Sequence, residues 1–401
     1  MTEQEREGGA ILYIASRLPA LSETFVFREL LGLRERGLTV HAASVRASDP
    51  FPWDERLEAL RHEATVVYDP ATTRTLPLAL FWRPGLTLAA LADAATSDHP
   101  SMGSRAKHAL QALMGIGAAW RLRKKNIRQV HAHMAHVPAT VGLYIARALG
   151  AKFSFTGHAA DLFADRAGLA FKLRRASFVS CISHWHQSFY GDVAGVAAER
   201  LPVIRCSVAL PETIRPEARE VVVVARLVPK KGIDLLIRAF AQAELSGWRL
   251  VIAGDGPERA GLEALALELG IAERTEFRGA QPHAKCLEAI AAGGIFVLPC
   301  RTATNGDKDG IPVVLMEAMA AGRSVISGDL PAIRELIEDQ VSGLLVPPDD
   351  VPALGRAIRR LAGDAPLRQS LAAAARARIE EEFCDAVNLD RLTGAFAEAA
   401  A

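Results

Sequence analysis

The stretch from Asp307 to Gly322 holds the residues best suited to bind an anion beside a hydroxylated ligand. It follows an apolar, strand-like segment, and Pro312 favours the first turn of a helix. Gly310 lets the backbone approach a ligand without a Cβ in the way. The backbone amides there would point at an anion, and Glu317 could accept hydrogen bonds from the paired hydroxyl groups of a ribose. The plainer alternative is an amphipathic helix with a surface glutamate.

A second group of candidate residues is basic. Arg226 and Lys231 lie in Arg-Leu-Val-Pro-Lys-Lys-Gly, directly after a very apolar strand-like segment. A solvated basic loop is the alternative. Gly254 and Gly256, in Gly-Asp-Gly-Pro, permit a tight turn that is either structural or placed under a nucleotide base.

Histidines in the first half also follow strand-like segments. His158 lies in Thr-Gly-His-Ala-Ala-Asp, which ends at Asp161. Its alternative is a structural histidine with satisfied hydrogen bonds. His131 and His133 have a spacing that could serve a metal, but the sequence shows no third ligand, so we expect no metal site.

The elements that must position these residues alternate between strands and helices. In the first half we expect strands at 10–15, 39–45, 130–132, 152–156 and 178–182, with helices at 23–36 and 138–149. In the second half we expect strands at 221–225, 249–253, 275–278, 295–299 and 324–327, with helices at 233–245, 257–269, 285–291 and 312–321. The last fifty or so residues read as helix rich in Ala and Arg. The pattern predicts two doubly wound, Rossmann-like α/β domains with ligands at the carboxyl ends of parallel strands.

We expect a domain linker in Pro-Glu-Thr-Ile-Arg-Pro-Glu-Ala-Arg-Glu, residues 211–220. The expected division is 1–213 for the first domain and 214–375 for the second. Residues 376–401 would form a C-terminal helix that packs back on the first domain.

Composition narrows the class of protein. The chain of 401 residues is 50% hydrophobic and 23% charged, with a net charge of +1, which argues against nucleic-acid binding. We expect no signal peptide, and the apolar window 76–95 is broken by Arg83, Pro84 and Gly85. The five cysteines are scattered and suggest free thiols in a reducing cytoplasm.

Although the net charge of the chain is close to zero, one segment of it is strongly basic. Residues 99–160 contain no Asp or Glu, and cations gather between Arg105 and Arg128 around an apolar stretch, 109–120. A basic segment beside an apolar helix suits an anionic membrane surface, so 105–128 is a candidate peripheral docking segment. A core helix with a solvated basic end is the alternative.

Taken together, these motifs resemble the retaining glycosyltransferases of the GT-B fold, family 4. The resemblance covers about residues 11–350, and Pro19 to Phe25, with Ser-Glu-Thr-Phe, is similar to exopolysaccharide and colanic-acid-type members. It implies transfer of a sugar from a nucleotide diphosphate sugar, with UDP favoured, to a glycan or lipid-linked acceptor. It implies front-face attack without a metal or other cofactor. The chain carries Asp309 where the family usually has Glu, which sets the carboxylate back by roughly 1.5 Å.

The resemblance also assigns roles to single residues. It implies donor binding by Arg226, Lys231, Gly254, Gly256, Gly279, Asp309, Gly310, Ile311, Pro312, Val313 and Glu317. The implied catalytic residues are His158, Asp309, Arg226 and Lys231. The acceptor-side residues would be Ser22, Glu23, Thr24, His133 and Asp161, although Ser22 could equally cap a helix.

Three other functions share parts of this pattern. A pseudo-transferase that only binds nucleotide sugar is suggested by Asp309 and opposed by Arg226, Lys231 and Glu317. An epimerase of the same fold should need several acid and base groups, and the sequence offers only His158. A dehydrogenase is opposed by the lack of Gly-x-Gly-x-x-Gly after the first strand of either domain. We expect a cytoplasmic enzyme on the inner face of the membrane.

Overall fold

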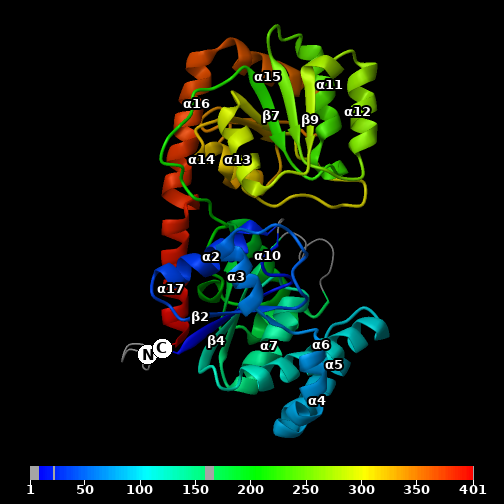
Figure 1. Ribbon diagram of the computed structural model, residues 1–401, viewed down its shortest axis with the longest axis vertical. Helices are drawn as coiled ribbons and strands as arrows, with labels where there is room; N and C mark the ends of the chain where they lie inside the picture. Colours follow the sequence, from blue (N-terminus) through cyan, green and yellow to red (C-terminus); the bar gives the residue numbers. More distant parts are fainter. Residues whose placement is uncertain (1–8, 21–22, 159–166, 401) are drawn as a thin grey trace. The chain divides into compact units, whose positions relative to one another are not determined.

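The computed structural model describes residues 9–20, 23–158 and 167–400 (Figure 1). The chain divides into two compact units: unit 1 holds Met1–Arg205 and Leu389–Ala401, and unit 2 holds Cys206–Asn388. The change from one unit to the other therefore comes at Arg205 and Cys206, ahead of the expected boundary at 213 and of the charged 211–220 segment.

Unit 1 is built on a six-stranded parallel sheet in the order β3-β2-β1-β4-β5-β6. The strands are β1 Ala10–Ala15, β2 Val40–Ser44, β3 Thr65–Val66, β4 Ile127–His133, β5 Lys152–Gly157 and β6 Phe178–Cys181. Its described helices are α2 Thr24–Glu35, α3 Glu55–Glu63, α4 Pro70–Trp82, α5 Pro84–Thr96, α6 Met102–Leu122, α7 Val137–Leu149, α9 Leu169–Arg175, α10 His184–Ala194 and most of α17 Asp385–Ala400. The strands and helices foreseen for this half are all present, and β4 is longer than foreseen.

The side chains of β1 alternate between two hydrophobic cores, as the two-residue period of a strand requires. Leu12 and Ile14 belong to the core under α6 and α7. Ile11 and Tyr13 belong to the core under α2 and α17, which includes Leu389. The C-terminal helix thus packs on unit 1 from Leu389 onward, where Arg36 also pairs with Asp390.

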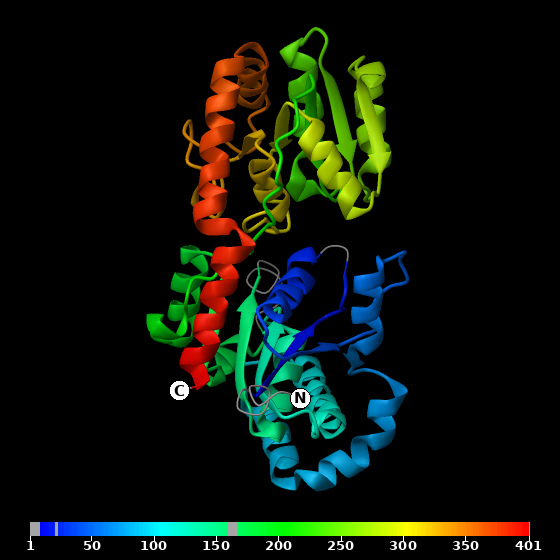
Figure 2. The same ribbon diagram turned by 60° about the vertical axis from the view of Figure 1, so that its left-hand side comes forward.

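Helices α4, α5 and α6 form an extra layer over α7. The helical segment is interrupted between Trp82 and Pro84, as the broken apolar window indicated. Both α4 and α5 pack on α6 (Figure 2). The apolar part of α6 is buried against α7: a Cβ on Gly115 would lie 2.7 Å from the carbonyl oxygen of Val141. At its end, Arg121 pairs with Asp69 at 3.0 Å. The apolar stretch of the expected docking segment is therefore interior packing, which corrects that part of the sequence interpretation.

Within the described residues, no helix by itself has the length and apolar character to cross a bilayer. Only α4 and α5 taken together meet that test, and they are bent by 104° at their junction.

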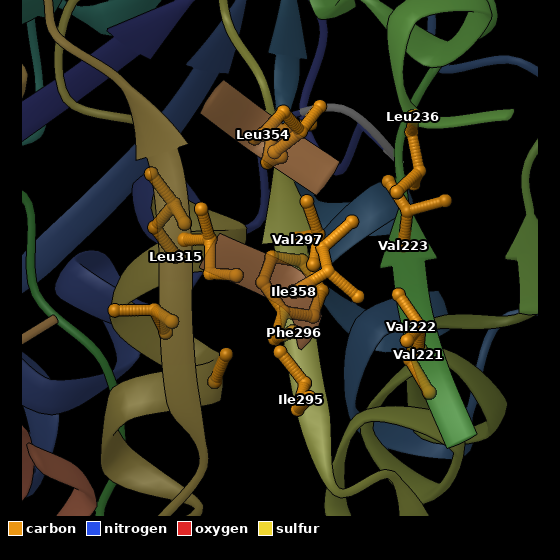
Figure 3. Close-up of a cluster of buried hydrophobic side chains, with 14 of the residues drawn as sticks. Val221, Val222, Val223, Leu236, Ile295, Phe296, Val297, Leu315, Leu354 and Ile358 are labelled. Carbon is orange, nitrogen blue, oxygen red and sulfur yellow. The ribbon is translucent and has the colours of Figure 1, made fainter. Parts of the chain in front are cut away.

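Unit 2 repeats the architecture with the sheet order β12-β11-β10-β7-β8-β9. Its strands are β7 Glu220–Val224, β8 Arg249–Ala253, β9 Thr275–Gly279, β10 Ile295–Leu298, β11 Ser324–Gly328 and β12 Leu344–Val346. Helices α11 Ile233–Ala243, α12 Arg259–Glu268 and α15 Val351–Gly363 pack together, and α13 His283–Ala292, α14 Val313–Ala320 and α16 Ala365–Arg378 form a second group. The central strands are apolar on both faces, as parallel strands between helices must be, and Figure 3 shows part of this core around Phe296 and Ile358.

Both sheets have the strand order 3-2-1-4-5-6 of a doubly wound fold, in which the chain switches direction between the first and fourth strands. Ligands of such sheets bind outside the carboxyl ends of these two strands. In unit 2 these are β7 and β10, and in unit 1 they are β1 and β4. The sequence motifs whose residues could bind a ligand or take part in a reaction follow these strands.

Candidate active site

A buried ion pair joins the two strands at the switch point of unit 2. Lys231 ends a short 3₁₀ turn after β7, and its Nζ lies 2.8 Å from Oδ2 of Asp309, which precedes α14. The side chains of Lys231 and Asp309 are only 15% and 12% exposed. Lys230, for which the sequence predicted no role, places a second ammonium group 3.5 Å from Asp309. The thiol of Cys300 donates a hydrogen bond to the same carboxylate at 3.3 Å.

The pair stays ionised because each partner offsets the other's burial. Burial by itself would raise the pKa of Asp309, but Lys231 and Lys230 outweigh it and hold the pKa below its ordinary value. Burial by itself would lower the pKa of Lys231, but Asp309 outweighs it and raises that pKa. The site therefore presents a fixed ammonium beside a fixed carboxylate at neutral pH.

Arg226 lies on the same loop in a different environment. It is exposed and makes no ion pair within the described residues. The loop is held by backbone contacts with the loop after β8: Leu227 N donates to Asp255 O at 2.9 Å. A Cβ on Gly254 would lie 1.8 Å from the carbonyl oxygen of Ala225, and its φ of +140° also favours glycine. The structure thus brings the Arg226 loop and the Gly254 turn together.

The other glycines of the predicted donor site occupy similar close approaches. Gly256 lies against the carbonyl of Leu227, and Gly279 ends β9 and accepts a hydrogen bond from Gly254 N at 2.8 Å. Close backbone packing explains Gly254 and Gly256, and a φ of +67° favours glycine at 279, so the three glycines have structural roles whether or not a base lies over the turn.

Helix α14 starts one residue later than expected. Pro312 is its N-cap residue, and Val313 is the first residue of the helix. Gly310 and Ile311 are buried just before it. This segment therefore delivers a helix N-terminus next to Asp309, as the sequence motif indicated.

Glu317 lies in the second turn of α14 and is 9% exposed. Its Oε1 is 2.8 Å from Nε2 of His283, the first residue of α13. His283 was missed by the sequence reasoning because it has no motif of its own and lies 34 positions away. His283 thus holds the Glu317 carboxylate through Oε1, and the other oxygen, Oε2, could accept a hydrogen bond from a ligand.

Unit 1 contains a buried cluster of histidines at the carboxyl end of β4. His133 Nδ1 lies 3.2 Å from His158 Nε2, and His133 Nε2 lies 3.0 Å from both Glu29 Oε1 and Tyr13 Oη. Phe25 packs its ring 4.8 Å from the ring of His158. The predicted residues His133 and His158 therefore meet, and Glu29 of α2 joins them.

The cluster corrects the statement that His131 and His133 have no third potential metal ligand. They project from the same face of β4, and Glu29 brings its carboxylate within 4.8 Å of both. Protein groups already occupy these nitrogens, however: His131 contacts Ser154 Oγ at 2.8 Å and Thr156 Oγ1 at 2.9 Å. The arrangement is a complete hydrogen-bond network as it stands.

The network limits where its protons can lie. A carboxylate only accepts, so the contact with Glu29 calls for a proton on Nε2 of His133. Of His133 Nδ1 and His158 Nε2, one donates and the other accepts. Burial lowers the pKa of His158 well below its ordinary value, and the neighbouring His133 lowers it further. His158 is thus a neutral imidazole.

A pocket of about 990 Å³ opens at the switch point of unit 1. Its lining includes the predicted Glu23, and it mixes cations with aromatic rings: Arg17, Arg46, Lys107, Phe51, Trp53 and Tyr68. Thr24 is instead buried as the first residue of α2. Glu23 is the N-cap residue of that helix and makes no side-chain cap bond. Ser22 and Asp161 lie outside the described residues.

Comparisons with known proteins relate this chain to glycosyltransferases. The family described as "Glycosyl transferases group 1" matches residues 211–378. An exopolysaccharide phosphotransferase of Streptomyces coelicolor is 40% identical over 185 residues, which are 44% of this chain and 18% of that protein. The amylovoran biosynthesis glycosyltransferase AmsK of Erwinia amylovora is 35% identical over 199 residues, 47% of this chain and 48% of that protein. The chain thus matches about half or less of the length of these relatives.

A solved structure extends the likeness to the whole chain. The structure of HepE from Anabaena in complex with UDP superimposes with a TM-score of 0.73, covering 97% of this chain and 100% of that one, at 17% identity. At this identity the likeness concerns the fold alone. It confirms the expected GT-B fold of two parallel-sheet α/β domains.

Proposed function

We propose that the protein transfers a sugar from a nucleotide diphosphate sugar to a glycan or lipid-linked acceptor, because residues 211–378 match the family described as "Glycosyl transferases group 1". We further propose that the donor is a UDP-sugar, that the anomeric configuration is retained and that the product belongs to an exopolysaccharide or cell-envelope glycan. The UDP complex of HepE and the biosynthetic name of AmsK support the donor and the product.

The observation that carries the proposal is the set of charges at the unit 2 switch point. Arg226 is exposed, and Lys231 is kept positive by its buried pair with Asp309. A departing diphosphate requires fixed cations in a place of low dielectric constant, because charge develops there as the glycosidic bond breaks. Arg226 would contact the diphosphate first, and Lys231 would stabilise the charge that develops.

Asp309 and Glu317 would hold the two sugars of the donor. Asp309, with the amides near Gly310, would accept from hydroxyls of the transferred sugar, and Glu317 would accept from those of the ribose. In the proposed front-face reaction, the acceptor oxygen forms its bond to the anomeric carbon as the bond to the diphosphate breaks. The departing phosphate oxygen takes the acceptor's proton, so no side-chain nucleophile, metal or other cofactor is required.

His158 would contact the transferred sugar through a hydrogen bond. A neutral imidazole has one donor and one acceptor nitrogen, so it can serve a sugar hydroxyl in either role. Glu29 and His133 would act as positioning residues that hold the imidazole of His158 in place. The same buried groups are poorly suited to an epimerase, which must exchange protons with substrate, since each is already hydrogen-bonded within the protein.

The 990 Å³ pocket of unit 1 would receive the acceptor. Its aromatic rings suit sugar faces, and Arg46 and Lys107 suit a phosphate that links a glycan to a lipid. We propose that the protein works in the cytoplasm at the inner face of the membrane, where such acceptors are presented, and that nucleic acids are not among its partners.

The test is binding and turnover of UDP-, GDP- and ADP-sugars, with and without EDTA, by the wild type and Glu317→Ala. We expect one donor to bind, binding to be unaffected by EDTA, and Glu317→Ala to weaken it by about tenfold or more, the loss of a charge-assisted hydrogen bond. Glu268→Ala, at an exposed position of α12, is the matched control.

Each other outcome contradicts a definite part of the proposal. If the folded wild type binds no donor, the transferase assignment fails. Conversion of the donor to its epimer would identify an epimerase, and binding without turnover would favour a pseudo-transferase. Loss of activity in EDTA that a divalent cation restores would contradict metal independence.

A further inference from the structure

Helices α4 and α5 expose four of their large apolar side chains. Leu78 and Phe81 on α4 are 58% and 86% exposed, and Leu88 and Leu91 on α5 are 69% and 45% exposed. Each pair has the i, i+3 spacing that places two side chains on one face of a helix. We call these four residues the outer apolar face.

The inner faces of the same helices combine small residues with half-buried Leu76, Leu80, Trp82 and Leu86. Ala79 of α4 and Ala90 of α5 are fully buried, and they pack with Ala112 and Ile116 of α6. The hydrophobic effect alone would place leucine and phenylalanine inside and alanine outside. An exposed apolar cluster of this kind marks a surface that binds a partner.

The charges around the outer apolar face indicate which partner. Residues 70–92 contain no Asp or Glu, and they include Arg74 and Arg83. The carboxylates at the two ends are neutralised from inside the protein: Asp69 pairs with Arg121, and Asp93 with Arg147. A face of this kind is complementary to a surface that is apolar within and negatively charged at its boundary.

We propose that the outer apolar face docks on an anionic lipid bilayer. Leu78, Phe81, Leu88 and Leu91 enter the boundary between headgroups and acyl chains, and Arg74 contacts lipid phosphates. The bend of 104° between α4 and α5 lets both helices lie on the surface rather than cross it. This places the membrane contact on α4 and α5 and not on the apolar stretch of α6, which is interior (Figures 1 and 2).

The docking face and the acceptor pocket share one helix. Lys107 and Leu110 of α6 line the pocket, and α4 and α5 pack on the same helix. Resting on the proposed function, the docked protein would hold its acceptor pocket close to lipid-linked substrates. The docking itself requires no transferase activity, so it can be tested separately.

The experiment is co-sedimentation of the full chain with vesicles of phosphatidylcholine alone or with one quarter phosphatidylglycerol. We expect binding to the anionic vesicles, weakened by salt. The double variant Phe81→Ser with Leu88→Ser should lower the partition coefficient by about tenfold or more, since each inserted side chain contributes about a factor of ten. Arg74→Gln should lower binding to anionic vesicles only.

The matched control is Leu267→Ser, which removes a 72% exposed leucine from α12 of unit 2 and should leave binding unchanged. Circular dichroism will show that the exposed-site variants fold. Absence of wild-type binding, or equal binding by the double variant, would overturn the proposal. It would also be overturned if the wild type is a dimer that the double variant dissociates, because a second copy would then cover the face.

Discussion

Replacing Lys231 by Met tests most directly whether the ion pair of Lys231 and Asp309 stabilises unit 2. The change keeps the length of the side chain and removes the ammonium 2.8 Å from Asp309. At an effective dielectric constant of 20, the Coulomb attraction across that distance is about 6 kcal/mol before desolvation is subtracted. Removing one partner of a buried pair costs about 3–5 kcal/mol, and Lys230, 3.5 Å from Asp309, will offset part of it. We therefore expect Lys231→Met to lower the free energy of unfolding of unit 2 by about 3 kcal/mol.

The pH dependence gives the sign of the effect. In the wild type the pKa of Asp309 is depressed by folding, so its stabilisation is present above the unfolded pKa of about 3.9 and is lost as pH falls through the lower folded pKa. In Lys231→Met, burial is left with less compensation and raises the pKa of Asp309. The deficit of the variant should then be largest at neutral pH and shrink on acidification toward pH 4.

The assay is amide hydrogen exchange of peptides that contain β7 and β10, because it reports the opening of unit 2 separately from unit 1. The double variant Lys231→Met with Asp309→Asn removes both charges and should return to within about 1 kcal/mol of the wild type. If the two single effects simply add, with a coupling below about 0.5 kcal/mol, the pair is not coupled and the reasoning is wrong.

Two further predictions concern unit 1. Glu29→Gln should lower kcat/KM by about tenfold, because an amide can donate or accept and no longer fixes the proton of His133. Nitrogen-15 spectra should show changed protonation of the His133 and His158 ring nitrogens, whereas unchanged spectra would refute the positioning role of Glu29, and Glu55→Gln on the exposed side of α3 is the control. The second prediction concerns the pH dependence of stability. Burial is the main cause that lowers the pKa of His108 to about 4, and His99 and Lys172 add to it; the value in the unfolded chain is 6.5. The unfolded chain then binds more protons between these values, so the free energy of unfolding should fall on acidification from pH 6.5 to 4. His108→Gln should reduce that slope by up to about 1.4 kcal/mol per pH unit in urea titrations, and an unchanged slope would contradict the assignment.

Local patterns were sufficient for the framework of both sheets. Apolar runs ended by glycine or polar residues marked β1, β8 and β10 closely, since a parallel strand buried on both faces must be apolar throughout. Helices such as α11 and α14 followed from the 3.6-residue period and from Pro312 near the helix start. Helices α3, α4 and α5 gave no assignment; in α4 and α5 the exposed face also carries large apolar residues, so the usual contrast between an apolar and a polar face is missing.

The sequence by itself also indicated candidate donor-site residues in the loops and helices that follow strands, because a motif and its strand are neighbours in the chain. Arg226, Asp309 and Glu317 became candidates in this way, and their roles stay predictions. Their partners were not: His283 meets Glu317 only because α13 packs beside α14.

Tertiary structure alone decided which contacts form between distant segments. Glu29 and His133 are 104 positions apart and meet because α2 covers the face of the sheet to which His131 and His133 point. Composition could not distinguish α6, whose apolar stretch is largely buried, from α4 and α5, where Leu78, Phe81, Leu88 and Leu91 are exposed, since all three helices are apolar. Periodicity records which residues share a face of a helix, but only packing determines whether that face meets protein or solvent.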